Sequence, residues 1–170
     1  MTESPVREYR PELLPRSGEA IAWAFLLVTS LNLVVLRRWL GEIPVAAWAV
    51  WALLLFFAVS ISFNNWVERH TFLRLDENGI TFENGLRSVR LTWPEVKEMS
   101  RFPARWGEAI QVLGQNTGFV FHTLGEVHLQ GRLRGRTGFA EGEKILEEIV
   151  AMGRLNQVTE SKGIVYYSRR

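Results

Sequence analysis

Two apolar runs decide the architecture of this chain: AIAWAFLLVTSLNLVVL at residues 20–36 and VAAWAVWALLLFFAVSISF at residues 45–63. Neither run contains a charged residue, and each approaches the roughly 20 residues that cross a bilayer core about 30 Å thick. A segment of eight residues, 37–44, connects them. The sequence therefore predicts a membrane hairpin over residues 20–63, made of two transmembrane helices.

Four tryptophans favour this interpretation over a buried core helix of a soluble domain. They lie near or just beyond the ends of the two runs, where an indole ring is half buried while its N–H stays wet. A cleaved secretory signal is the other alternative for the first run. Residues 1–19 carry four glutamates and no small-residue cleavage site precedes the second run, so we expect no cleavage. The tryptophans are Trp23, Trp39, Trp48 and Trp66.

The distribution of basic residues predicts the orientation of the hairpin. Five arginines flank its outer ends and two lie in the connecting segment, and basic residues are retained on the cytoplasmic side. We therefore expect an integral protein of the cell inner membrane with both termini in the cytoplasm, residues 1–19 included. The chain has no cysteine, so disulfides say nothing about its compartment. The arginines are Arg7, Arg10, Arg16, Arg69 and Arg74 at the outer ends, and Arg37 and Arg38 in the segment between the runs.

Asn32 is the costly polar residue inside the hairpin. Its amide needs a partner, either a backbone carbonyl or a hydroxyl such as Ser60 or Ser62 on the other helix, and we expect a structural role. Neither run contains an ionisable residue, which argues against a transport pathway. The expected partners of the hairpin are the lipid bilayer itself and, through a homo-oligomer, further copies of the chain.

The remaining residues, 64–170, are enough for one compact domain, and their first half has the pattern of strands. Strands are expected at 71–75, 80–83 and 86–92. Turns at Asp76 to Gly79 and at Asn84-Gly85 separate them, the second as a type I′ turn with positive φ at both central residues. Gly79 and Gly85 are thus expected to be structural.

Trp93 precedes Pro94, so the third strand is expected to end or turn a corner there. Further strands are predicted at 96–102, 109–113 and 118–123, followed by a loop-like segment, 124–137, in which 127–133 is an alternative short strand. Apolar residues then recur at helical spacing over 140–155, with glutamates opposite. We expect Trp93 to pack beneath this helix, against Ile145 and Ile149. Residues 156–170 are expected to form a tail.

This order of elements resembles the bacterial pleckstrin-homology-like (PH-like) domains that follow a short membrane hairpin. The resemblance is carried by LRLDENGI at 73–80, by VRLTWPEV at 89–96 and by the closing helix at 140–150. It implies a PH-like domain over 64–155: an antiparallel barrel or sandwich, with Trp93 packed under the sheet and a C-terminal helix as a cap. The family has no shared catalytic site to carry over. Photosystem I assembly proteins are similar in architecture only, with a membrane hairpin before a strand-rich domain.

Charge and motifs argue against several functions. Residues 64–170 hold 15 basic and 13 acidic residues, so no strong field for nucleic acid follows. His122, Glu126 and His128 have residue types that bind metals, but surface polar residues at a strand end are the simpler interpretation. The chain lacks a cysteine nucleophile and a phosphate-binding loop. We therefore expect no enzymatic activity, no cofactor and no metal, and keep a membrane-bound metal-dependent hydrolase as an alternative.

The best candidates for a binding surface are arginines. Arg132, Arg134 and Arg136 alternate with other residues, so in an extended strand they point the same way and can contact an anionic leaflet, with Arg169 and Arg170 in addition. Arg101 and Arg105 flank a basic and aromatic loop. The sequence thus predicts a membrane-anchored, non-enzymatic binding or scaffold module that recognises a protein partner or anionic lipid. The alternative is an assembly factor for a larger membrane complex.

Overall fold

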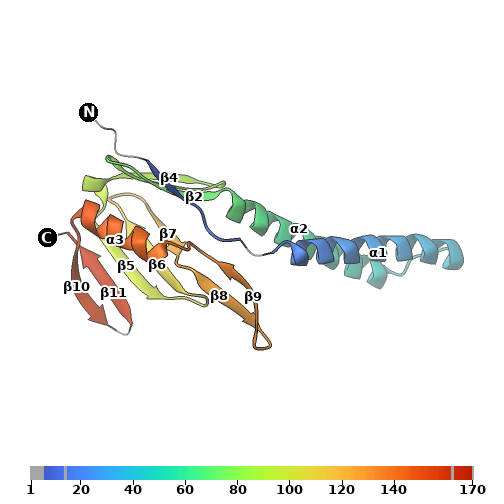
Figure 1. Ribbon diagram of the computed structural model, residues 1–170. Coiled ribbons are helices and arrows are strands. Elements are labelled where there is room, and N and C mark those ends of the chain that lie inside the picture. The colour runs from blue at the N-terminus through green and yellow to red at the C-terminus, as the bar shows by residue number, and fades with distance from the viewer. Residues whose placement is uncertain (1–5, 14, 162, 170) are drawn as a thin grey trace. The chain divides into compact units, whose positions relative to one another are not determined.

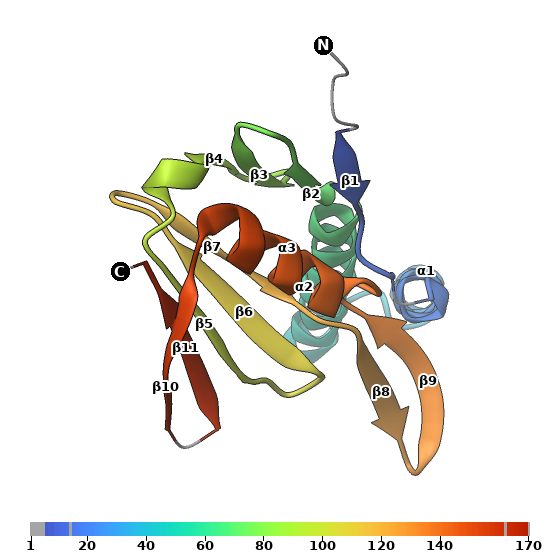
Figure 2. The same ribbon diagram turned by 60° about the vertical axis from the view of Figure 1, so that its left-hand side comes forward.

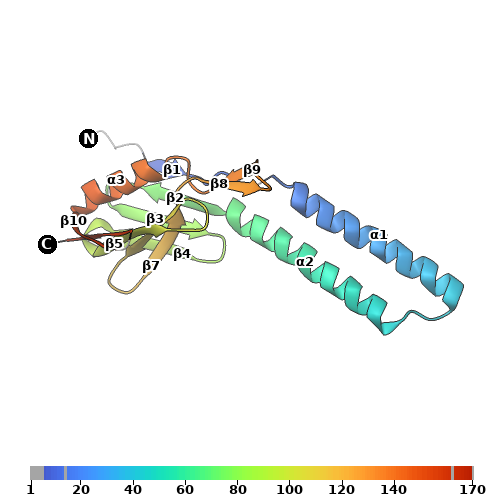
Figure 3. The same cartoon turned by 90° about the horizontal axis from the view of Figure 1, so that it is seen from below.

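The computed structural model describes residues 6–13, 15–161 and 163–169. The chain forms two compact units, which we call the hairpin unit (Pro15–Trp66) and the sheet unit (Met1–Leu14 with Val67–Arg170). In the hairpin unit α1 (Ser17–Leu40) and α2 (Val45–Arg69) run antiparallel, side by side (Figures 1 and 3). Both helices extend beyond the predicted runs. Arg37 and Arg38 therefore lie in the last turn of α1 instead of a loop, where cations complement the helix dipole.

Both helices are long and apolar enough to cross a membrane. At about 1.5 Å per residue, 24 and 25 residues extend over about 36 Å, more than a bilayer core of about 30 Å. Only Leu26, Leu33 and Ala58 are buried among their described apolar side chains. Most apolar side chains of the two helices therefore face outward.

Polar groups between α1 and α2 are paired. The indole N–H of Trp51 donates to Ser30 Oγ, and that of Trp23 donates to Ser62 Oγ, each at 2.8 Å. The Trp23 N–H, expected to face water, thus bonds the partner helix. Asn32 bonds a backbone carbonyl, one of the two expected kinds of partner, because its Nδ2 donates to Val28 O of its own helix at 2.9 Å.

The first sheet of the sheet unit is antiparallel, in the order β1-β2-β3-β4. The strands β2 (Thr71–Leu75), β3 (Gly79–Asn84) and β4 (Ser88–Thr92) form the predicted meander. β1 (Arg7–Tyr9) pairs with β2 and was not predicted, because three residues are too few to show an alternating pattern. Tyr9 is buried, and its hydroxyl lies 3.3 Å from Glu148 Oε2 of α3 (Gly142–Gly153).

The two glycines named from the sequence have different roles. A Cβ atom on Gly79 would lie 2.0 Å from the Leu91 carbonyl oxygen, so the close approach of β3 and β4 requires glycine. Gly85 has a φ of 73°. The expected two-residue type I′ turn is wrong, because the loop between β3 and β4 has three residues, 85–87, and Asn84 does not have positive φ. Instead Asn84 Oδ1 accepts the N–H groups of Leu86 and Arg87 at 3.2 and 3.0 Å.

The chain turns its predicted corner at η1 (Trp93–Glu95), a short 3₁₀ helix, and continues into a second antiparallel sheet. This sheet has the order β10-β11-β5-β6-β7. The segment expected to be a tail supplies two of its strands, so the sheet unit extends past residue 155. The strands are β5 (Glu98–Pro103), β6 (Glu108–Leu113), β7 (Gly118–His122), β10 (Asn156–Ser161) and β11 (Ile164–Ser168).

The core lies between the two sheets and α3, which crosses the opening between them (Figure 2). Phe82 of the first sheet stacks on Phe119 of the second, with ring centroids 4.9 Å apart. Trp93, Ile145 and Ile149 belong to the same buried cluster, as expected. The sheets do not close into a barrel.

A third, two-stranded sheet projects from this body where a loop was expected. β8 (Gly125–Leu129) and β9 (Arg132–Thr137) pair in an antiparallel hairpin (Figures 1 and 2). Gln130 and Gly131 connect them, with φ of 52° and 74°, as a type I′ turn requires. Gly125 and Gly135 lie within these strands, and glycine has a low strand propensity, so the sequence favoured a loop. The hydrogen bonds between β8 and β9 outweigh that propensity.

Candidate functional site

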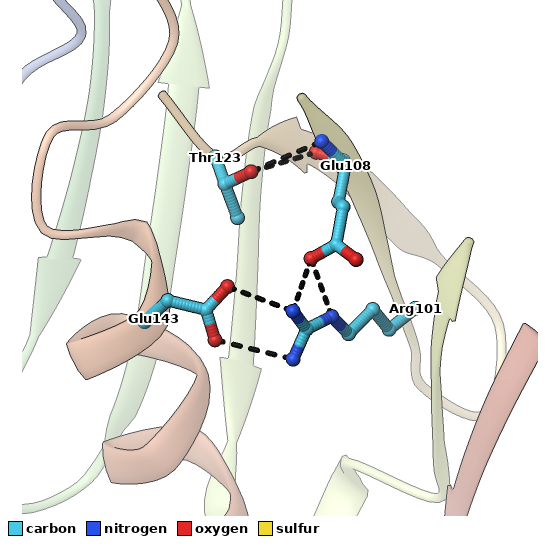
Figure 4. A network of polar contacts seen from close by, with 4 residues as sticks. All are labelled: Arg101, Glu108, Thr123 and Glu143. Atoms are coloured by element: carbon cyan, nitrogen blue, oxygen red, sulfur yellow. Dashed lines mark hydrogen bonds and ion pairs between the residues drawn. The ribbon is translucent and has the colours of Figure 1, made fainter. Parts of the chain in front are cut away.

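Arg101 is a structural clamp rather than a free cation. From β5 its guanidinium contacts Glu108 at the start of β6, and it forms two bonds with Glu143 of α3, at 3.0 and 3.2 Å (Figure 4). The hydrogen bond to Glu108 raises the pKa of Arg101 above its ordinary value. Thr123 Oγ1 accepts the backbone N–H of Glu108 at 3.0 Å and steadies the same corner. The charge predicted for lipid or partner binding is thus used within the fold.

Arg105 occupies the exposed loop between β5 and β6. Its guanidinium carbon lies 4.8 Å from the centre of the Trp106 ring, a cation–π geometry. Arg105 has no acidic partner among the described residues. The pair presents one positive charge and one half-exposed indole to its surroundings.

The three alternating arginines all lie on β9, and all are exposed. Arg136 lies 3.5 Å from Glu126 of β8, whereas Arg132 and Arg134 have no acidic partner in the part of the chain that the structure describes. The prediction that Arg132, Arg134 and Arg136 all point the same way because they alternate along a strand is wrong. Val127 pairs with Gly135 but His128 pairs with Leu133, so a β-bulge at Arg134 interrupts the period of two.

The residues considered for a metal do not form a cluster. Glu126 lies 3.8 Å from His128 Nε2 and 3.5 Å from Arg136, while His122 belongs to β7 in the second sheet. Over the described ranges, no three His, Cys, Asp or Glu side chains come together as metal ligands would. The described residues therefore offer no metal-binding cluster in support of the metal-dependent hydrolase alternative.

A groove that the sequence did not indicate lies between η1 and the end of α3. Its volume is about 570 Å³, and a second groove of about 320 Å³ shares Trp93 and Met152 with it. Met152 and Arg154, both exposed, make its lining partly apolar and partly cationic. The larger groove is lined by Trp93, Pro94, Met152, Arg154, Asn156 and Arg169.

Arg169 was expected to add to a lipid surface, and it has a structural role instead. Its guanidinium donates to three backbone carbonyls: Trp93 O at 2.8 Å, Pro94 O at 3.0 Å and Gly153 O at 2.8 Å. It thereby caps the C-terminal end of α3 and joins that end to η1. Arg170 lies outside the described residues. No local sequence pattern indicates Arg169, because its three partners are distant in the chain.

The comparisons add no identity to this geometry. No protein-family model matches the chain, and no curated protein matches it either. The structure itself shows the order of elements: two apolar helices near the N-terminus, followed by antiparallel sheets and a helix.

Proposed function

We propose that this protein is a non-enzymatic, membrane-anchored binding module with a PH-like domain, and that its β8–β9 hairpin contacts anionic lipid headgroups. The observation that carries the proposal is that two exposed arginines on a projecting hairpin, Arg132 and Arg134, have no acidic partner among the residues that the structure describes. Within 125–137, three arginines and one glutamate give a net charge of 3 − 1 = +2 with His128 neutral. Each cation near an anionic leaflet contributes about 1 kcal/mol of attraction.

The exposed apolar surface of α1 and α2 supports the anchor. Side chains such as Phe25 and Phe56 are more than half exposed, which is costly in water and favourable in lipid. β1 precedes α1 and β2 follows α2, and these strands pair, so both ends of the hairpin unit belong on one side of the bilayer. The excess of arginines at those ends makes that side the cytoplasm.

The chain segments that connect the two units are short, which supports a contact with the bilayer surface. Only His70 separates α2 from β2. Glu12 donates its backbone N–H to Gly138 O at 2.7 Å, directly after β9, and five residues further on α1 begins at Ser17. Five residues span at most about 17 Å, a length that supports contact between the β8–β9 hairpin and the headgroups.

Leu133 offers a direct test, because it lies between Arg132 and Arg134 and is 50% exposed. The full chain with Leu133→Cys carries a single cysteine and accepts an environment-sensitive fluorophore. We expect a blue shift in vesicles of phosphatidylcholine with phosphatidylglycerol relative to phosphatidylcholine alone. The shift should disappear at 1 M salt, where the Debye length is about 3 Å, and in the Arg132→Gln, Arg134→Gln double variant.

A matched control is Arg90→Gln with Lys97→Gln, two exposed cations without an acidic partner among the described residues. This variant should keep the shift. The same emission in neutral and anionic vesicles, or an unchanged shift in the arginine variant, would contradict the lipid contact.

The groove beside Trp93 favours a second candidate, a scaffold or assembly factor that binds a protein partner. Its exposed Met152 suits an apolar side chain, and Arg154 suits an acidic one. Purification of the full chain in mild detergent, with mass spectrometry of bound proteins, tests this candidate. A partner retained by the wild type but lost in Met152→Glu, with the fluorophore unshifted in anionic vesicles, would favour it over lipid contact.

A further inference from the structure

Asn32 leaves most of its hydrogen-bonding capacity unused on the outer surface of α1. A side-chain amide has two N–H donors and one carbonyl acceptor. One donor bonds Val28 O at 2.9 Å, and the other donor and Oδ1 have no partner among the described residues. The side chain is exposed, so these groups face whatever surrounds the hairpin unit.

The amide lies within the hydrocarbon if α1 spans the bilayer. Asn32 is four residues, or about 6 Å along the axis, from Leu36 at the end of the apolar run. Helical side chains point toward the N-terminus, and the bond to Val28 shows that this one does so. The amide therefore points away from the nearer interface, into the apolar region, where an unsatisfied polar group is costly.

The hairpin unit cannot supply the missing partners. α1 packs through Leu26 and Leu33, and successive residues of a helix are about 100° apart, so Asn32 faces well away from that seam. The hydroxyl of Ser30, by contrast, donates to Leu26 O and accepts from Trp51. A hydroxyl is satisfied within one hairpin, whereas the Asn32 amide needs a group from outside.

We propose that Asn32 is the contact residue of a self-association surface, and that its partner is the same amide in a second copy of this chain. The inference rests on the proposed membrane anchor. An amide is its own complement, because each copy offers a donor and an acceptor, and a twofold axis pairs them reciprocally. Copies inserted in the same orientation place Asn32 at the same depth in the bilayer. A different protein would need a polar group of its own at that depth.

The surface around Asn32 also permits close helix contact. Val28 and Val35 lie at i−4 and i+3, on the same side of α1, and both are more than half exposed. Val34 is two residues from Asn32 and lies on the opposite side of the helix, although it is exposed to a similar extent. The chain thus contains matched test and control positions.

Cysteine cross-linking in native membranes tests the proposal, since the full chain is otherwise free of cysteine. A disulfide requires Cα atoms within about 7 Å. Oxidation should convert Val28→Cys or Val35→Cys chains into covalent dimers of twice the mass, and Val34→Cys chains should stay monomeric. Asn32→Leu, added to Val28→Cys, should weaken association roughly fivefold, the effect expected of one interhelical hydrogen bond in a membrane. Asn32→Gln should restore it in part.

Each outcome decides a different point. Equal cross-linking at Val28→Cys and Val34→Cys, or dimers that persist unchanged with Asn32→Leu, would overturn the Asn32 surface. Cross-linked species of another mass would show that a different membrane protein occupies it, which also overturns self-association. Alkaline extraction separates this test from the anchor: a monomeric chain that stays with the membrane refutes the self-association alone, and a chain released to the supernatant refutes both.

Discussion

Trp93 holds together parts of the sheet unit that are far apart in the chain. Its side chain is 8% exposed, and its indole N–H donates to Asp76 O of the β2–β3 turn at 3.0 Å. Its own carbonyl accepts a bond from Arg169. A single residue therefore links the first sheet, the corner at η1 and the end of α3.

Replacing Trp93 by alanine should destabilise the sheet unit by about 3–5 kcal/mol, the range for aromatic truncation in a core. The measurement is denaturant unfolding of the full chain in mild detergent, with protease resistance as the readout of the folded fraction. Trp106→Ala is the control, because Trp106 lies in an exposed loop, and it should cost less than about 1 kcal/mol. Equal losses for the two variants would show that Trp93 does not anchor the core.

Acid sensitivity should depend on Glu95. Its carboxylate accepts the backbone N–H and the hydroxyl of Thr92, both at 2.8 Å, and the backbone bond chiefly lowers the pKa of Glu95 below 4.5. The folded state thus favours the ionised form. That contribution is present above pH 4.5 and is lost as the pH falls below it. Between pH 6 and pH 3 the melting temperature of Glu95→Gln should fall less than that of the wild type, whereas Glu160→Gln should follow the wild type. Parallel curves for Glu95→Gln and wild type would contradict this.

At the level of elements, the C-terminal strands complete the second sheet. β11 lies between β10 and β5, and Tyr167 packs against the core. A chain that stops at Leu155 would leave β5 as a bare edge with unpaired N–H and C=O groups.

We therefore expect truncation after Leu155 to abolish the protease resistance of the sheet unit, measured on the full-length and shortened chains in detergent. The control Val158→Thr changes an exposed residue of β10 and should leave resistance near the wild-type level. Wild-type resistance in the truncated chain would mean that the fold is complete at residue 155.

The strands β2 to β7 and α3 were predicted because each carries its own signal. Alternation marks β4, where buried Val89 and Leu91 are flanked by exposed residues, and the helical period marks α3. β10 gave no such signal, because all its residues are exposed and its position follows from pairing with β11. β1 depends in the same way on β2.

At the scale of the whole molecule, β1 precedes the hairpin unit in the sequence and β2 follows it. A strand before α1 is hydrogen bonded to the strand after α2. If the hairpin unit crosses a membrane, as we propose, these two strands must lie on the same side of it.

Cysteine labelling of intact cells should reveal this arrangement. We expect Glu42→Cys, in the segment between the helices, to react with a membrane-impermeant maleimide, and Val6→Cys and Ser88→Cys to react only after the cells are opened. Reaction at Val6 and Ser88 in intact cells would reverse the orientation. Different behaviour of Val6 and Ser88 would contradict the shared side.

The sequence by itself determined the features that depend on neighbouring residues. Two uncharged apolar runs predicted two helices long enough to cross a membrane, and the local spacing of apolar residues predicted most strands and α3. Both signals depend only on residues within a single helix or strand. Trp93-Pro94 predicted the corner between the sheets for the same reason.

Only the tertiary structure decided which groups remain available for binding. Arg101, Arg132 and Arg169 look equivalent in the sequence, yet Arg101 is paired with two glutamates and Arg169 with three backbone carbonyls. Of these three, only Arg132 has neither kind of partner among the described residues. The physical reason is that a charge finds its partner in space and not along the chain. The same holds for Asn32, whose open amide became evident only when α1 and α2 packed through another face.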